Sequence, residues 1–381
     1  MWPYLGVKPA PTLYFDARNV AAAADCWALG HDPLVDNPCD PWARPMNYPR
    51  VWVLLHYIGL SQARTIVFGT IAAVAFLGSL LLLVGRLSVR NGVILAAAVT
   101  SPAVMLSIER GNMDLILFAV FVGAVFAWKA RDRLTPWLSP ALILGAAATK
   151  YYAILALPAY AFTSDRRARL AVPAGVAIMA AYIVLTFADL EKVMSAPEGG
   201  LLYSYGARIM IGHLYHQFLA TGDWLHGNLL AQAIAVVPLV LLTVAAWTWA
   251  RRRLTPISTS KASHLQVLAF HLGALTYLGT FALRKNGDYR LVFVLLTLPL
   301  LLEWAAGARS ELRTKLARGG LIAVITGLWV GALSPFIGPW DEVGSWAVAG
   351  FLVALMAATV PSLRELLGRE PDRTAATVAA G

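Results

Sequence analysis

The stretch RTIVFGTIAAVAFLGSLLLLVG, residues 64–85, has no charged side chain after Arg64. A helix of this length measures roughly 33 Å, which is enough to cross the hydrocarbon core of a bilayer. In lipid, every backbone polar group must be satisfied within the protein, and a helix does this within a single segment. The stretch therefore predicts a transmembrane helix.

The rest of the chain repeats this pattern. Of its 381 residues 59% are hydrophobic and 14% are charged, whereas a soluble domain carries roughly 25% charged residues. We therefore predict an all-α, polytopic transmembrane bundle of about nine spans, formed by a single domain over residues 1–363. A tail, 364–381, is expected to be disordered. The further spans are expected at 91–108, 113–128, 170–187, 229–249, 264–283, 290–304, 320–336 and 344–362.

Positive charge orients these spans. The net charge of +10 comes largely from Lys and Arg clusters between apolar segments, a pattern that marks cytoplasmic loops and not nucleic-acid binding. One topology places all the basic clusters in the cytoplasm, and it requires residues 137–163 to enter the membrane and return as two half-helices that meet near Lys150. If residues 137–163 formed a single tilted span instead, every later segment would have the opposite orientation in the membrane. The segments left outside are 1–63, 109–114, 188–228, 284–289 and 337–343.

The first outer segment has several features of its own. Residues 51–60 (VWVLLHYIGL) are too short to span and indicate an interfacial helix. Cys26 and Cys39 could form a disulfide in an oxidising compartment or remain free thiols, because spacing does not fix their geometry. An N-terminus outside the membrane without a signal sequence predicts one more transmembrane helix upstream of Met1.

Charged motifs gather on the outer side of this topology. Cations there could bind a phosphate at the membrane surface, since guanidinium and ammonium groups bind phosphate oxygens strongly. Carboxylates could orient the cations, bind sugar hydroxyls or accept a proton. Interfacial side chains that only snorkel or pair locally are the alternative. The candidate cations are Arg110, Lys150, Arg284, Lys285 and Arg290, and the carboxylates are Asp16, Asp25, Glu109, Asp114 and Asp288.

The order of these motifs resembles the C-type (GT-C) integral-membrane glycosyltransferases, and most of all glycosyltransferase family 87, the DUF2029-type polyprenol-phosphate-mannose-dependent transferases. The resemblance spans roughly residues 14–300. It rests on Asp16 at the head of the first outer loop, LGHDPL (29–34), NYPRVW (47–52), ERGNMD (109–114), TKYYAILALP (149–158) and RKNGDYR (284–290).

The resemblance implies an inverting transfer of a hexose, mannose by analogy, from a polyprenyl-phosphate donor to a glycolipid or glycan acceptor. It places the reaction on the outer face of a bacterial plasma membrane, with Asp16 as general base. Asp16 could instead cap a helix over 17–28 or bind sugar, and Asp25 is the second candidate for the base. The other substrate-binding candidates are Tyr48, Asn112 and Tyr152, beside the carboxylates Glu109, Asp114 and Asp288.

No cofactor and no metal are expected, because the sequence has no DxD pair. His213 and His216 share a helix face in the stretch 203–220, but a third ligand is not evident. A transporter or flippase of a polyprenyl-linked sugar would use the same outer cations. It should also show ionisable residues at mid-membrane depth, which the spans 64–85, 170–187 and 229–249 lack. A non-enzymatic assembly subunit is the third alternative.

Overall fold

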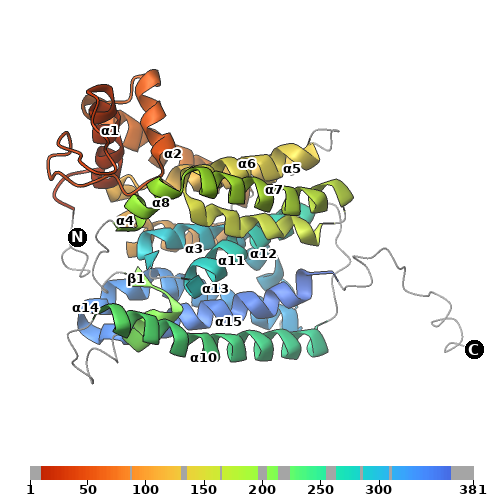
Figure 1. Ribbon diagram of the computed structural model, residues 1–381. Helices are drawn as coiled ribbons and strands as arrows, with labels where there is room; N and C mark the ends of the chain where they lie inside the picture. Colours follow the sequence, from red (N-terminus) through yellow and green to blue (C-terminus); the bar gives the residue numbers. More distant parts are fainter. Residues whose placement is uncertain are drawn as a thin grey trace, which may run out of the picture.

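The computed structural model describes residues 10–85, 88–129, 135–163, 165–195, 204–212, 224–254, 263–283, 286–308 and 311–361. The fold is a helical bundle with one two-stranded sheet in the described part (Figure 1). The longer elements are α1 (Phe15–Ala28), η2 (Arg50–Ile58), α2 (Thr65–Val84), α3 (Val89–Val99), α4 (Pro102–Arg110), α5 (Asp114–Lys129), α6 (Thr135–Thr149), η4 (Tyr151–Phe162), α7 (Arg166–Leu185), α8 (Phe187–Ser195), α10 (Trp224–Arg253), α11 (Ser263–Leu283), η5 (Asp288–Thr297), α12 (Leu298–Ala305), α13 (Leu312–Val330) and α15 (Glu342–Thr359). Short turns of helix are η3 (Gln62–Arg64), η6 (Gly331–Leu333), α14 (Ser334–Ile337) and η7 (Gly338–Asp341), and the strands are β1 (Ser204–Tyr205) and β2 (Asn286–Gly287).

The all-α bundle agrees with the sequence, but the structure supports fewer long spans than the nine expected. Six helices in the described part are long and apolar enough to cross a membrane, and a seventh is possible if α3 and α4 form one span bent by 58°. Pro102 opens α4 just after Ser101, whose side chain caps the helix, so the bend lies where proline cannot continue α3. The expected spans at 113–128 and 290–304 are α5 and the pair η5–α12, neither of which is among the six.

The prediction of two short helices that meet near Lys150 is confirmed. α6 ends at Thr149, η4 begins at Tyr151, and the two elements pack against each other. The 3₁₀ geometry of η4 lets few residues cover a long distance. At about 2.0 Å per residue its 12 residues extend roughly 24 Å, close to the length of the 15-residue α6.

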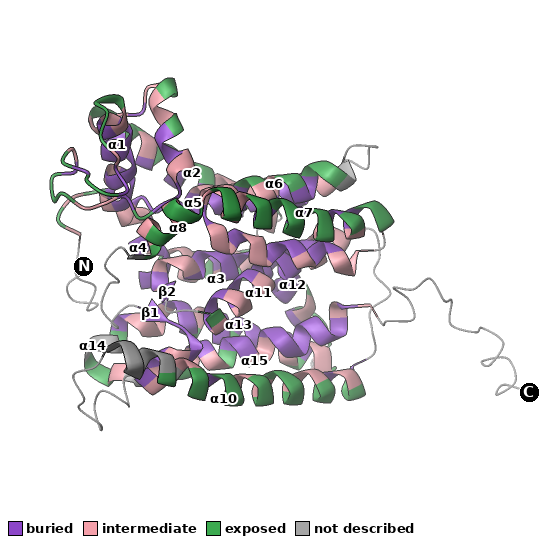
Figure 2. Cartoon of the chain, in the orientation of Figure 1, coloured by how far each residue is buried: buried purple, intermediate pink, exposed green. Residues whose placement is uncertain are grey.

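Burial divides the helices into an inner and an outer set. In the apolar stretches of α11 and α15, 61% of residues are buried inside the protein, against 22% in α7 and 11% in α10. Figure 2 shows the same contrast, with α11 and α12 largely buried and α7 and α10 largely exposed. A helix that is apolar all round yet mostly exposed suits contact with lipid, so α7 and α10 form the lipid-facing edges of the bundle.

The N-terminal segment packs on one end of this bundle. Tyr14 precedes α1 in a left-handed conformation (φ 58°), and its backbone N–H donates to the carbonyl of Glu109 at 2.7 Å. Its ring lies against Gly69, where a Cβ would come within 2.4 Å of the ring, and a Cβ on Gly111, which has φ +57°, would lie 3.0 Å from the Tyr14 side chain. Two glycines thus let Tyr14 join the first loop to α2 and to the end of α4.

An ion-pair network ties α8 to the first loop. Arg50 donates from Nη1 to Asp32 at 3.0 Å and from Nη2 to Asp189 at 2.7 Å, and Lys192 also reaches Asp32, at 2.9 Å. Burial alone would raise the pKa of Asp32, but hydrogen bonds from Arg50 and Lys192 outweigh it and lower the pKa to about 2. Because a depressed carboxyl pKa stabilises the fold only while the group is ionised, this contribution is present at neutral pH and lost as pH falls from about 4 towards 2.

Replacement of Arg50 tests this connection. Arg50→Met leaves Asp32 and Asp189 without their shared partner, so we expect backbone hydrogen exchange in residues 32–48 and in α8 to speed up several-fold, measured by mass spectrometry in detergent. Arg64→Met is the matched control, because the hydrogen bond described for the exposed Arg64 side chain goes to the nearby carbonyl of Gly59 and leaves the Arg50 network intact. Equal exchange in Arg50→Met and wild type would mean that the network does not hold α8 in place.

The first loop contains a disulfide between Cys26 and Cys39, whose Cα atoms are 5.6 Å apart. It fastens the end of α1 to the loop that follows, 13 residues along the chain. A loop of this size loses enough unfolded-state entropy to stabilise the fold by about 3 kcal/mol in the chain-entropy model. We expect Cys26→Ser with Cys39→Ser to lower the midpoint of thermal unfolding by several degrees. An unchanged midpoint, compared in non-reducing buffer, would argue against the bond.

Candidate active site

A cluster of charged and polar side chains lies at the end of the bundle that the N-terminal segment covers. We call it the polar cluster. Its members come from four separate parts of the chain, and each of them is a candidate site residue predicted from the sequence. They are Asp16, Arg110, Asn112, Asp114, Lys150, Tyr152 and Arg290.

Asp16 is the first centre of the polar cluster. Arg110 binds its carboxylate through two hydrogen bonds, from Nε to Oδ2 at 2.9 Å and from Nη2 to Oδ1 at 2.7 Å. Asn112 donates to Oδ2 at 2.6 Å. Such a bidentate guanidinium–carboxylate pair is both strong and geometrically defined. Asp16 is 7% exposed, so its orientation is fixed from within the protein.

The alternative role of Asp16 as a helix cap is wrong. α1 begins at Phe15, the N-cap position is Tyr14, and no side chain caps the helix. Asp16 therefore lies inside the first turn, where an acidic residue is favoured by the helix dipole. Its carboxylate turns to Arg110 and Asn112 instead of to the backbone N–H groups of its own helix.

Local structure explains how Arg110, Asn112 and Asp114 come together. Gly111 adopts the left-handed conformation that ends α4 (φ 57°), and the chain then turns so that α5 can begin at Asp114. Within that turn the side chain of Asn112 accepts a hydrogen bond from the N–H of Asp114 at 3.0 Å. The ERGNMD motif is thus a turn between α4 and α5 that brings the side chains of Arg110, Asn112 and Asp114 into the polar cluster.

Asp114 is the second centre. Its carboxylate is fully buried and accepts hydrogen bonds from Lys150 and from the hydroxyl of Tyr152. Arg290 lies farther away, with Nε 3.9 Å from Oδ2, which is beyond hydrogen-bond distance. The guanidinium of Arg290 stacks on the ring of Tyr152 at 4.6 Å. Arg290 also donates a hydrogen bond from Nη1 to the side-chain oxygen of Asn286, so its guanidinium is positioned by β2 as well as by Tyr152.

Asn112 joins the two centres. Its Nδ2 donates to Asp16, and its Oδ1 accepts from Lys150 Nζ at 2.9 Å. Lys150 itself occupies the break between α6 and η4, where an extended backbone (φ −149°) lets the side chain point into the cluster. Trp52 fixes that break from the first loop, because its indole N–H donates to the carbonyl of Thr149 at 2.9 Å.

Tyr48 lies beside the cluster as the sequence analysis proposed. Its ring is 5.0 Å from the ammonium of Lys150 and only 5% of its surface is exposed. Burial, aided by the nearby charge of Asp16, raises the pKa of Tyr48 well above its ordinary value. The phenol is therefore neutral and can donate a hydrogen bond.

Other predicted site residues lie apart from the cluster or outside the described residues. Asp25 accepts a hydrogen bond from the N–H of Gln62 at 2.9 Å, and Glu109 accepts from the N–H of Ala10 at 2.8 Å. Asp288 is buried against Gly331, where an added Cβ would lie 2.3 Å from its carboxylate. The predicted residues outside the described part of the chain are Arg284, Lys285, His213 and His216.

Two aromatic residues that flank Arg110 were not predicted from the sequence. The guanidinium lies 5.4 Å from the ring of Phe15 and 5.6 Å from the ring of Tyr289. Both are sequence neighbours of residues that were selected, Asp16 and Arg290. Being next to a candidate residue in the sequence does not predict a place in the polar cluster, because neighbouring residues on a helix usually point in different directions.

Within the described part of the chain, no group of three or more His, Cys, Asp or Glu side chains is arranged to hold a metal ion. The polar cluster itself combines positively charged side chains with carboxylates. It can bind an anion through three cations and accept a proton on a carboxylate.

Comparison with known protein families finds a match to part of the chain. Residues 51–196 match the model of glycosyltransferase family 87. No curated protein and no solved structure matches the chain. The matched segment contains Arg110, Asn112, Asp114, Lys150 and Tyr152 of the polar cluster. The match supports the resemblance noted in the sequence: residues 51–196 of this chain are similar to the GT-C-like glycosyltransferases of family 87.

Proposed function

We propose that the chain transfers a hexose, mannose being the first candidate, from a polyprenyl-phosphate donor to a hydroxyl of a glycolipid or glycan. The polar cluster is the active site, and it faces the non-cytoplasmic side of the membrane. The observation that carries this proposal is the convergence of Asp16, Arg110, Lys150 and Arg290 at one end of a transmembrane bundle. A lipid-linked phosphate is held at the surface of a bilayer, where these groups can reach it.

The charge of the cluster supports this class of donor. Arg110, Lys150 and Arg290 supply three positive charges, and Asp16 and Asp114 supply two negative ones, so the described members leave one positive charge in excess. A phosphodiester between a sugar and a lipid carries a single negative charge. The excess positive charge therefore matches the charge of one bound donor. As the sugar departs, a second negative charge develops on the phosphate, and the same cations stabilise it.

Asp16 is the general base in this mechanism. The acceptor oxygen attacks the anomeric carbon, the bond from that carbon to the phosphate oxygen breaks, and polyprenyl phosphate leaves with the bonding electrons. The acceptor proton passes to Asp16, and the configuration at the anomeric carbon inverts. Of the described contacts, Oδ2 receives two hydrogen bonds and Oδ1 one, so Oδ1 retains a lone pair for the proton.

The other members prepare the site. Arg110, whose side chain is 29% exposed, is the cation with the freest access to an incoming phosphate, and its hydrogen bonds to Asp16 aim it towards the reacting centre. Asn112 keeps Asp16 and Lys150 at a fixed separation, since it bonds to both. Such preorganisation removes the cost of reorganising dipoles during the reaction.

A transfer assay with matched donors tests the proposal. Purified full-length protein is supplied with radiolabelled mannosyl polyprenyl phosphate or with nucleotide-linked mannose, and with membrane extract as acceptor. We expect label to enter the acceptor from the lipid-linked donor only, with release of polyprenyl phosphate. Transfer from the nucleotide donor alone would contradict the proposed donor class. Movement of the intact labelled lipid across vesicle membranes without any transfer would indicate a flippase instead.

A further inference from the structure

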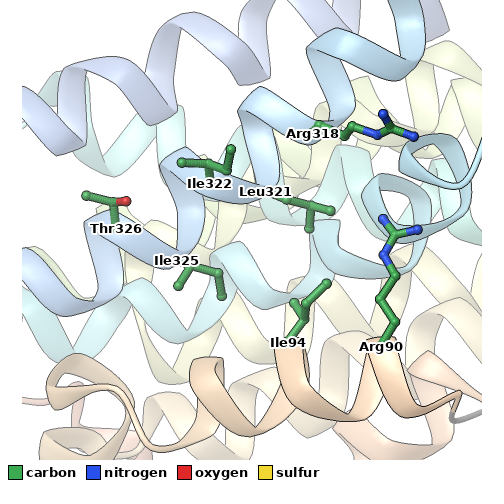
Figure 3. Close-up of a pocket in the computed structure, with 7 residues that line it drawn as sticks. All are labelled: Arg90, Ile94, Arg318, Leu321, Ile322, Ile325 and Thr326. Carbon is green, nitrogen blue, oxygen red and sulfur yellow. The ribbon is translucent and has the colours of Figure 1, made fainter. Parts of the chain in front are cut away.

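A groove between α3 and α13 lies outside the polar cluster. Its volume is about 410 Å³, and Figure 3 shows two arginines at one end and aliphatic side chains along its length. The lining residues are Arg90, Ile94, Arg318, Leu321, Ile322, Ile325 and Thr326. Ile322 is 68% exposed, which on a transmembrane helix means exposure to lipid.

The groove lies at the end of the bundle away from the polar cluster. α3 begins at Val89 beside the groove, and its continuation α4 ends at Arg110 in the cluster. α13 runs the same way, because Arg318 is near its start while Gly331, just past its end, lies against Asp288. A hydrogen bond from the indole of Trp329 to the carbonyl of Ala97, at 2.8 Å, joins the two helices beyond the groove. The two arginines therefore mark the opposite membrane surface.

The two arginines differ in how they are held. Arg318 is fixed in place, since its Nε donates to the carbonyl of Ala305 at 3.0 Å. Arg90 is exposed, one residue into α3, and can move towards a ligand. Among the described residues that line the groove there is no carboxylate, so two positive charges meet there without an acidic partner in that lining. Interfacial arginines often snorkel singly, but a pair above one apolar groove complements an anion that carries a hydrocarbon tail.

We propose that this groove binds an anionic phospholipid of the leaflet opposite the polar cluster. Its phosphate lies between Arg90 and Arg318, and one acyl chain lies along Ile94, Leu321 and Ile325. From Arg318 to Thr326 the helix rises roughly 12 Å, so the groove covers the upper part of an acyl chain. The bound lipid would cover the seam between α3 and α13, and it takes no part in the transfer reaction.

Lipid-dependent thermal unfolding of the full-length protein tests this site. Protein purified in a neutral detergent is titrated with phosphatidylglycerol, phosphatidylcholine or inorganic phosphate, and the unfolding midpoint is followed. We expect phosphatidylglycerol to raise the midpoint of wild type in a saturable way, and the other two to have little effect. Arg90→Gln should weaken the apparent affinity roughly tenfold, because a hydrogen bond to a charged group contributes about one decade. Arg90→Gln with Arg318→Gln should abolish the shift.

The matched control is Arg166→Gln with Arg167→Gln, which removes two exposed arginines from the start of α7, away from the groove. This variant should keep the full shift. Because Arg318 also bonds to the main chain, its replacement can impair folding. If the double variant does not fold, the lipid-induced shift of Arg90→Gln alone tests the proposal. An equal shift with inorganic phosphate or phosphatidylcholine, a normal shift in Arg90→Gln, or an equal loss in the control would each overturn the proposal. None of these outcomes bears on sugar transfer.

Discussion

Replacement of Asp16 by Asn is expected to reduce sugar transfer by roughly a hundred- to ten-thousand-fold, the range for loss of a general base. Asn has almost the same shape and can still accept hydrogen bonds from Arg110 and Asn112, but it cannot take up a proton. Donor binding should persist, because the cations of the polar cluster remain. Initial rates with a labelled polyprenyl-phosphate sugar, together with equilibrium binding of the same donor, separate the two effects.

Asp25→Asn is the matched control for this experiment. Asp25 lies on the same helix, nine residues further along, and its carboxylate bonds to the N–H of Gln62 and not to the polar cluster. We expect this variant to retain most of the transfer rate. If Asp16→Asn were fully active, or if Asp25→Asn were the inactive variant, Asp16 would not be the base.

Replacement of Lys150 by Met is expected to have the second large effect, on both stability and transfer. Lys150 is 6% exposed and bonds to Asn112 and Asp114, and Asp114 is fully buried. Removing one member of a buried ion pair leaves the other charge without compensation and typically costs about 3–5 kcal/mol. The unfolding midpoint should fall sharply, and transfer should fall with it, because a cation of the proposed phosphate site is lost.

A double variant separates these two consequences. Asp114→Asn with Lys150→Met removes both charges of the pair, so much of the lost stability should return. Transfer should stay low, because the neutral pair cannot stabilise the leaving phosphate. If the double variant recovered transfer together with stability, Lys150 would be structural only and the proposed phosphate site would lose one of its three cations.

The sequence predicted the class of fold because lipid imposes it. Long uncharged segments can satisfy their backbone only as helices, and segments such as 64–85 and 264–283 became α2 and α11. Basic flanking clusters predicted the break at Lys150. The number of spans was harder to predict from the sequence, because hydropathy does not reveal 3₁₀ geometry or a bend. η4 covers as much distance as a longer α-helix, and the bend before Pro102 divides what the sequence showed as one span.

The sequence also predicted that the members of the polar cluster lie together, but it did not predict which of them pair. Topology brought Asp16, Arg110, Lys150 and Arg290 to one side, and the structure joins them within one network. Which carboxylate each cation contacts depends on side-chain geometry, such as the left-handed turn at Gly111 that places Asn112 between two centres. The partner of Asp25 depends on side-chain geometry in the same way. Asp25 lies nine positions after Asp16 on the same helix and points in a different direction, so it bonds to Gln62.

The central claim is that the polar cluster holds the phosphate of a lipid-linked sugar. A cryo-electron microscopy map of the full-length protein in lipid nanodiscs, with a polyprenyl phosphonate analogue of the sugar donor bound, tests it most directly. We predict phosphonate density within hydrogen-bond distance of at least two of Arg110, Lys150 and Arg290, with the sugar beside Asp16. Analogue density at another surface of the bundle, above all in the groove between Arg90 and Arg318, with the polar cluster unchanged, would contradict the claim.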